Sequence, residues 1–473
     1  MRKFPSPKKV FLNRRRLYLS NLIEGKVSTT LLKFAIPFLL ASLLQALYGA
    51  ADVFVVGQYA DSAAVSAVAI GSQFMQTITG IILGISMGGT VLIAKRIGER
   101  NNEQAANAIG TLSILFVITA IILTPFILLL ADSIINLMQT PTEAVAFTKQ
   151  YLVICAIGIP FIIGYNGVSG IFRGLGDSKT PVYFVLIACI INIIVDIVLV
   201  GIFKMGATGA AIATVSSQAI SFIFSLIYMT KKGFKFNINK SHFKLHKESV
   251  KYILIVGLPI AIQDALVGVS FLIITSVINT MGLVASASVG VVGKIITFAM
   301  LPPIAFGSAV SAMTAQNMGA GLIKRSKKIL YCGISYSLVC GIIVTLYSQF
   351  YPETLTAIFS SDADVIKVAG QYLKSFSIDC IMVSFVFCLN GYFSGLGKST
   401  VSLIHSLIAT FAFRIPLTYL ISQTEDVTLY ELGFAAPLST IVSIIICFGY
   451  LAWENKKQNI QQSEKLSTSS SLS

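Results

Sequence analysis

Two polar side chains interrupt the apolar run at 187–200, which reads IACIINIIVDIVLV. Asn192 and Asp196 are four residues apart, so a helix would place them on one face, about one turn apart. In a bilayer, a carboxylate at this position costs on the order of 2.5 kcal/mol or more and should face the protein interior rather than lipid. A buried intramembrane carboxylate indicates an ion or proton path by default, and Asp52 in the first apolar run raises the same question.

Asp52 and Asp196 are expected at a similar depth, in the outer half of the membrane, because a helix rises about 1.5 Å per residue. Asn192, Gln45 and Thr214 should lie within about two turns of that level. Carboxylate, amide and hydroxyl oxygens of this kind could hold Na⁺ as hard ligands. Alternatively, repulsion between the two acids would let one of them bind and release a proton. The residues leave both chemistries open.

A second charged group is expected near the midplane, where Asp264, Lys294 and Asp379 fall within about a turn of one another. Lys294 then has two acids within reach, which predicts either a paired, near-neutral cluster or a cation-attracting wall of a substrate cleft. Arg414 should be held by backbone carbonyls or by Asp379, and His405 is interpreted as a packing residue. Further candidates for the substrate cleft are Tyr48, Tyr151 and Asn166.

The elements that must position these groups are long apolar helices. The chain has 473 residues, of which 55% are hydrophobic and only 12% charged, with a mean hydropathy of +0.82. Soluble domains carry roughly twice that share of charge, and a run of about 20 apolar residues spans a bilayer. The sequence therefore predicts an all-α membrane protein. The expected spans are 33–56, 66–93, 107–130, 148–171, 180–202, 207–230, 252–278, 284–316, 328–350, 369–393, 399–422 and 430–453.

The net charge of +15 follows the topology of these spans. Most of the Lys and Arg residues cluster in alternate loops, which predicts a multi-pass protein of the cell membrane with both termini in the cytoplasm. The basic clusters are interpreted as topology signals and contacts to lipid headgroups, so membrane lipids are expected partners and nucleic acid is not. We expect a monomer.

An internal repeat divides the chain at a basic loop. A shift of about 221 residues superposes Pro37 near Pro259, Tyr151 on Tyr372, and the GLG motif at 174–176 on that at 395–397. Because each half has an even number of spans, the halves share one orientation and their symmetry axis lies along the membrane normal. Two such bundles can enclose a cleft that opens to either side. The expected organisation is a basic segment 1–30, a six-helix bundle 31–230, a linker 231–251, a second six-helix bundle 252–453 and a tail 454–473.

The repeat also separates shared residues from specialised ones. Asp52 matches Ile274 and Asp196 matches Leu417, so neither acid has a counterpart in the other half. An acid that the common bundle needed for folding should occur twice. We therefore interpret both residues as parts of an ion or proton site.

The chain lacks the motifs of several other functions. It has no GxxxxGK[ST] loop, and no GxSxG, HExxH or paired Cys/His set. All seven cysteines fall in or beside the expected spans without CxxC spacing, as packing residues do. We expect no enzymatic activity, no cofactor and no bound metal beyond Na⁺ at the paired acids, with transport driven by an ion gradient or passive.

Several segments share order and spacing with one family of transporters. They are QALYGAADVFVVGQY around Asp52, Ile171–Phe184 (IFRGLGDSKTPVYF), Asn192–Asp196 (NIIVD), Gly206–Gln218 (GATGAAIATVSSQ), GLPIAIQDAL and Thr314–Gly321 (TAQNMGAG). Over about 30–453, this pattern resembles the multidrug and toxic compound extrusion (MATE) family, in the branch with an ion-site aspartate in the first helix.

The resemblance implies an antiporter that expels cationic, lipophilic compounds in exchange for H⁺ or Na⁺. It places the ion site at Asp52, Asn192, Asp196 and Thr214, with Gln45 nearby and Tyr151 as an additional candidate. Asp264 departs from the family pattern, so a second coupling site in the second half stays open.

Two other interpretations compete with drug efflux. A flippase or exporter of a lipid-linked or metabolite cargo of the same superfamily would carry a cleft rich in bases. Here the acids outnumber the bases within the spans, which favours cationic cargo; the acids are Asp52, Asp196, Asp264 and Asp379, and the bases are Lys294 and Arg414. A membrane enzyme is disfavoured because the acids lie on separate spans without a nucleophile or metal set.

Overall fold

A computed structural model describes residues 22–234, 236–424 and 427–470, with side chains up to residue 457. Residues 1–21 of the expected basic N-terminal segment lie outside this range. Within the described residues, twelve helical segments are long and apolar enough to cross a membrane, which confirms the predicted all-α, twelve-span fold.

The first half contains six of these segments. They are α2 (Val27–Tyr59), α3 (Ser62–Gly98), α4 (Asn102–Leu137), α5 (Val145–Gly174), α6 (Lys179–Asp196) with its π-helical continuation Ile197–Ile202, and α7 (Gly206–Lys232). The helices begin where short polar side chains cap free N–H groups: Asp61 accepts from the Ala64 amide at 2.8 Å, and Asn101 from the Gln104 amide at 3.0 Å.

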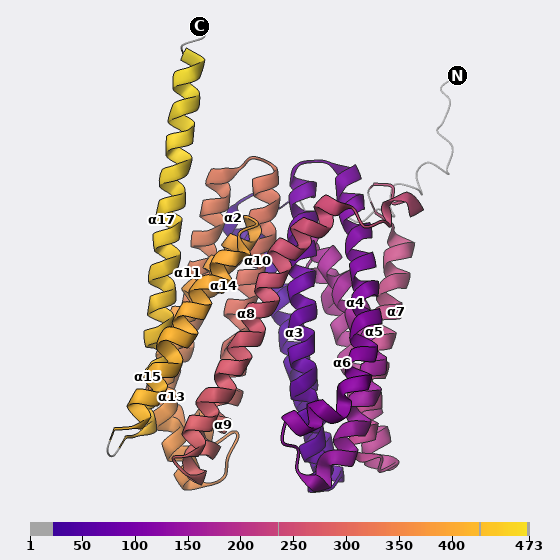
Figure 1. Cartoon of the computed structure of the whole chain (residues 1–473), viewed down its shortest axis with the longest axis vertical. Helices are drawn as coiled ribbons and strands as arrows, with labels where there is room; N and C mark the ends of the chain where they lie inside the picture. The colour runs from indigo at the N-terminus through magenta and orange to yellow at the C-terminus, as the bar shows by residue number, and fades with distance from the viewer. Residues whose placement is uncertain (1–21, 235, 425–426, 471–473) are drawn as a thin grey trace, which may run out of the picture.

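The second half repeats this arrangement with more interruptions. Its helices are α8 (Lys247–Asn279), α9 (Leu283–Ala299), α10 (Leu301–Gly319), α11 (Ile323–Phe350), α12 (Pro352–Thr356), α13 (Ala363–Gly395), α14 (Ser399–Leu407), a π-helical turn (Ile408–Arg414), α15 (Ile415–Ser422), α16 (Leu429–Leu432) and α17 (Ala435–Ser470). We expected the last span to end near residue 453, but α17 continues to Ser470 and extends beyond the other helices (Figure 1).

The first helix of each half packs partly with the other half. Leu31 and Phe34, near the start of α2, belong to the apolar core of the second half, whereas Val55 and Val56 near its end belong to that of the first. Likewise, Ile253 near the start of α8 packs into the core of the first half. Each of these helices therefore crosses from one bundle to the other along its length.

The two halves meet closely at the end of the molecule from which α17 extends, and their ribbons diverge toward the opposite end (Figure 1). Glycines allow the close approach. A Cβ atom on Gly84 of α3 would lie 2.8 Å from the Gly257 carbonyl oxygen of α8, and one on Gly257 would lie 2.7 Å from the Gly84 oxygen. Near the end of α3, Gly98 packs on the Gln316 carbonyl of α10 with no room for a side chain. This contact brings α3 of the first half and α10 of the second half close together.

Candidate functional site

The paired acids of the first half come together in the structure. Asp52 on α2 faces the side chains of Asn192 and Asp196 on α6 and of Thr214 on α7. Thr214 Oγ1 donates a hydrogen bond to Asp52 Oδ2 at 3.1 Å. Asp52 is 7% exposed, and Asn192 and Asp196 are fully buried. Three helices that lie far apart in the sequence thus converge on one polar centre.

This centre contains more buried donor and acceptor atoms than the protein satisfies. Among the described residues, Asp52 Oδ1, both carboxylate oxygens of Asp196 and both amide atoms of Asn192 are buried without a hydrogen-bond partner. No basic side chain in the described part of the chain forms an ion pair with either acid. Buried polar atoms are normally paired, and uncompensated charge in low dielectric is costly. The donor set fits a hard monovalent cation, or a proton shared by the two carboxyl groups.

Helix geometry places Asp196 at an irregular point. Asn192 and Asp196 follow the expected four-residue spacing on α6, and the helix changes to π-helical winding directly after Asp196. Such π-helical turns are rare and occur frequently at functional sites. The second half has its own π-helical turn in the corresponding span, and that one ends at Arg414.

A cavity of about 440 Å³ opens beside the acids. Asp52 and Thr214 form part of its wall, whereas Asn192 and Asp196 lie behind them. The remaining predicted residues that line it are Gln45, Tyr48, Tyr151 and Asn166. The structure therefore joins the predicted ion-site residues and the first-half cleft candidates into one continuous region. Tyr151 fits because its ring lies against Gly71 of α3, where any side chain would overlap it.

Several cavity residues were missed by the sequence reasoning. Gln218 donates from Nε2 to the Tyr48 hydroxyl at 3.3 Å, and its own Oε1 is buried without a partner among the described residues. Gln218 lies one helical turn after Thr214, so the four-residue spacing on α7 could have identified it. The other missed polar or sulfur-bearing lining residues are Ser72, Met75, Gln76, Thr79, Cys155 and Tyr165.

The second-half charges do not form the expected cluster. In the described residues, Lys294 has no acid within 4.0 Å; it is exposed, with its ammonium 5.9 Å from the centre of the Phe359 ring. The prediction of a Lys294 pair with Asp264 or Asp379 was wrong, because similar depth does not place side chains on facing sides of their helices. Asp264 is instead exposed on α8 next to Gly80 of α3, which lines the cavity.

Asp379 and Arg414 also differ from expectation. Arg414 lies 4.5 Å from the Phe271 ring centre and forms no ion pair with Asp379 within the described residues. Asp379 is buried, and its Oδ1 atom lacks a hydrogen-bond partner in that same part of the chain. His405 is buried as expected, but it forms hydrogen bonds with Asn390 at 2.7 Å and Ser443 at 3.2 Å.

Across the described residues, twelve candidate spans in two similar halves, with buried acids that lack a basic partner beside a cavity, define a membrane transport protein rather than an enzyme. The MatE family model matches the chain twice, over residues 37–198 and 259–420. The chain therefore belongs to the MatE family of transporters.

Relatives and solved structures agree with this assignment. The probable multidrug resistance protein YpnP of Bacillus subtilis (strain 168) is 29% identical over 400 residues, covering 84% of this chain and 89% of that protein. The probable multidrug resistance protein YoeA of the same strain is 25% identical over 434 residues, covering 90% and 94%. An outward-facing structure of a multidrug resistance MATE family transporter of the MOP superfamily has a TM-score of 0.87 at 21% identity, covering 92% of this chain and 98% of that chain.

Proposed function

We propose that this transporter is a secondary active antiporter that exports cationic, lipophilic compounds in exchange for H⁺ or Na⁺. The observation that carries the proposal is the carboxylate pair of Asp52 and Asp196, buried in one half beside a cavity without a basic partner among the described residues. The names of YpnP and YoeA as multidrug resistance proteins support the efflux direction.

The cavity chemistry suits an aromatic or aliphatic cation. Its wall carries the phenol rings of Tyr48, Tyr151 and Tyr165, and the adaptable thioether of Met75. Aromatic faces attract cations, and methionine adapts to varied shapes. Among the residues that the structure describes, no Lys or Arg lines this cavity, so the Asp52 carboxylate sets its charge.

Exchange follows from the position of Asp52. This carboxylate faces the cavity on one side and Asp196 on the other, so a cation at the acid pair reduces the negative charge available to cargo. Loading of the pair would therefore release a cationic compound, and emptying of the pair would restore its site. Because α2 packs with both halves, a change around Asp52 can alter how the halves meet.

We further propose that the molecule works in the cell membrane, with both termini in the cytoplasm, as the distribution of basic residues predicts. In this orientation, the closely packed end of the two halves is cytoplasmic. The proposed ion site and cavity lie within one chain, so a monomer suffices.

The test is efflux of a cationic dye from energised cells that express the full chain. Asp196→Asn should abolish gradient-driven export, because the amide removes the charge that a proton or Na⁺ would neutralise. Asp132→Asn is the control, since it makes the same chemical change at an exposed acid of the first half and should leave export largely intact. Normal export by Asp196→Asn, at equal protein in the membrane, would refute the coupling role.

The coupling ion can be identified with purified protein in vesicles. Separately imposed Na⁺ and proton gradients should drive dye movement in one case and not in the other. Movement under neither gradient, with cargo flowing only down its own gradient, would contradict secondary active transport.

A further inference from the structure

A second cavity of about 450 Å³ lies at the closely packed end of the molecule, away from the ion site. Its wall includes Lys33 of α2, Lys179 of α6 and Lys232 of α7. Among the described residues, no acid lies within ion-pair distance of these three ammonium groups. Lys232 instead donates to the Tyr228 hydroxyl. Three helices thus present basic side chains to one hollow.

The acidic residue of this wall does not neutralise the lysines. Asp177 Oδ1 accepts from the backbone amides of Lys179 and Thr180, both at 3.0 Å, and its Oδ2 accepts from Thr180 Oγ1 at 2.6 Å. The carboxylate therefore caps the start of α6 and is committed to that backbone. The cavity keeps a positive balance.

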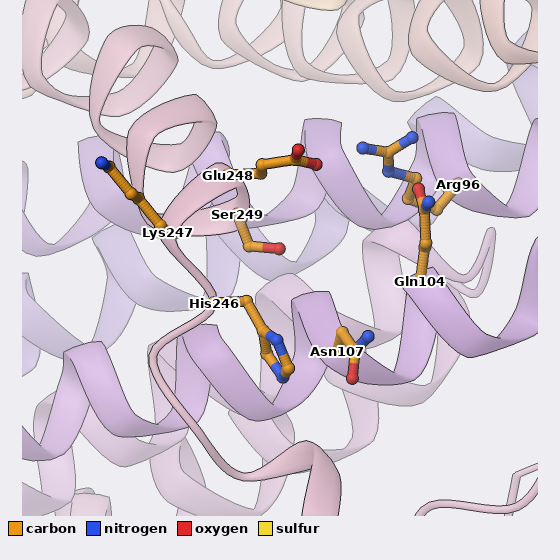
Figure 2. Close-up of a pocket in the computed structure, with 7 residues that line it drawn as sticks. All are labelled: Arg96, Gln104, Asn107, His246, Lys247, Glu248 and Ser249. Carbon is orange, nitrogen blue, oxygen red and sulfur yellow. The ribbon is translucent and has the colours of Figure 1, made fainter.

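The cavity in Figure 2 provides a contrast at the same end of the molecule. It measures about 240 Å³, and Glu248 points toward Arg96 across it, while Lys247 points away (Figure 2). Arg96 also forms a 2.8 Å ion pair with Glu99. Its charges are mixed and largely compensated within the protein, so this cavity has no comparable demand for an anion.

A stripe of apolar side chains, most of them exposed, follows each of the three lysines along its helix. On α2 the stripe continues from Lys33 through Ile36 and Leu40, at helical spacings of three and four residues. On α6 it continues from Lys179 through Tyr183, Leu186 and Ile190, and on α7 from Lys232 through Tyr228 to Phe224 and Ile220. Basic groups at the membrane surface above exposed apolar faces match the shape and charge of a phospholipid.

We infer that this cavity binds the headgroup of an anionic phospholipid of the cytoplasmic leaflet, with its acyl chains along the stripes of α2 and α6. The leaflet follows from the orientation given under the proposed function. The phosphate oxygens sit among the three ammonium groups, and the hydroxyls of Ser178 and Tyr228 line the same hollow. A zwitterionic lipid has no net charge to satisfy the site.

The bound lipid would connect the two halves. Lys33 belongs to the part of α2 that packs into the second-half core through its neighbours Leu31 and Phe34, whereas Lys179 and Lys232 belong to helices of the first half. A headgroup held by all three lysines therefore stabilises the conformation in which this end is closed.

The experiment measures lipid binding by the full chain in nanodiscs by native mass spectrometry and thermal unfolding, with no gradient or cargo. Nanodiscs of phosphatidylcholine alone are compared with nanodiscs that also contain phosphatidylglycerol in both leaflets, so membrane orientation does not affect the readout. We expect retained phosphatidylglycerol and a higher melting temperature with the anionic lipid. The combined variant Lys33→Gln, Lys179→Gln and Lys232→Gln should weaken retention about a hundredfold, at about fivefold for each lysine near the surface.

The matched control neutralises three exposed lysines of the segment 240–251, as Lys240→Gln, Lys244→Gln and Lys251→Gln, which line neither of the two cavities described above. It changes the total charge equally and should keep most of the phosphatidylglycerol. Replacement of the three cavity lysines by arginine preserves the positive charge and should also preserve phosphatidylglycerol retention. This result would show that substitution at these positions does not by itself disrupt the fold.

Equal losses in the cavity variant and the control at 240–251 would reduce the effect to general surface charge and overturn the proposal. Inorganic phosphate, added to phosphatidylcholine nanodiscs, separates a lipid from a free anion. If phosphate raised the melting temperature as much as phosphatidylglycerol does, the ligand of the cavity would be a soluble anion and not a lipid. Because none of these readouts involves transport, failure here is distinct from failure of the antiport proposal.

Discussion

The proposed mechanism can be tested at the tight glycine contact where α3 and α8 cross. Gly84→Ala adds a Cβ atom 2.8 Å from the Gly257 carbonyl oxygen and 2.8 Å from the Ala261 amide nitrogen. Ordinary contact begins at 3.4 Å, so the helices must separate by about 0.6 Å. A gap of this size forfeits a quarter to a half of the attraction between the facing atoms, and overpacking typically costs about 1–3 kcal/mol.

This penalty applies only while the two helices are in contact, so it should shift the balance between conformations rather than unfold the protein. A cost of about 1–3 kcal/mol corresponds to a change of about 5–150-fold in the ratio of the closed to the opened arrangement at this crossing. The exposed residues Leu137 and Ile358 lie at the end of the two halves opposite the closely packed end. Spin labels at these residues would report the shift as a larger fraction of molecules with a short distance between the labels.

The control is Gly293→Ala on α9, where an added Cβ atom meets nothing within 4 Å. It matches the chemical change in a membrane helix without touching the interface between the halves. If Gly84→Ala and Gly293→Ala gave the same distance distribution as the unmodified protein, the crossing would not control how the halves meet. The reasoning from glycine contact to gating would then be refuted.

Three further substitutions test other parts of the structure. Thr214→Val removes the hydrogen bond to Asp52, so about tenfold more coupling ion should be needed for half-maximal dye efflux, as measured by an ion titration; an unchanged titration would contradict a role in the site. Pro37→Ala restores a backbone N–H within α2 and stiffens it between the two cores, so efflux should slow at an unchanged ion requirement; equal rates would exclude a bend there. Gly110→Ala should lower the melting temperature by a few degrees, because Gly110 packs on the His242 carbonyl of the linker without room for a methyl group; an unchanged melting temperature would mean that the linker yields freely.

The geometry of the proposed ion site was predictable because it depends on spacings that helices fix. Asn192 and Asp196 are one turn apart in any helix, and apolar run lengths determine depth. The absence of repeat partners marked Asp52 and Asp196 as specialised. These arguments sufficed to bring together residues from three spans.

Rotation about helix axes was not predictable in the same way. Lys294 and Asp379 have similar depth, yet one is exposed beside Phe359 and the other buried near Arg414. Charge alone does not orient a helix, since the apolar faces of α9 and α13 decide which side chains meet. The π-helical turns after Asp196 and before Ile415 likewise have no clear sequence signal.

The packing of the linker against the first half was also not predicted from the sequence. Its basic composition indicated only a linker between the halves, but Phe234 and Phe236 pack onto the core of the first half. His242 is buried there and lies 3.2 Å from Glu103, and Thr111 donates to the Lys244 carbonyl. Isolated aromatic residues within a charged segment were the available clue.

The exchange of α2 and α8 between the bundles bears on how such a chain could arise and be divided. The first turns of α2 pack in the core of the second bundle, and the first turns of α8 pack in the core of the first. A polypeptide that ended after α7 would leave the apolar residues around Leu31 without their covering, so an ancestral single-bundle protein would have had to pair with its twin from the outset. Fusion of the duplicated coding sequences would then have joined, in one chain, two bundles that already exchanged the first turns of a helix.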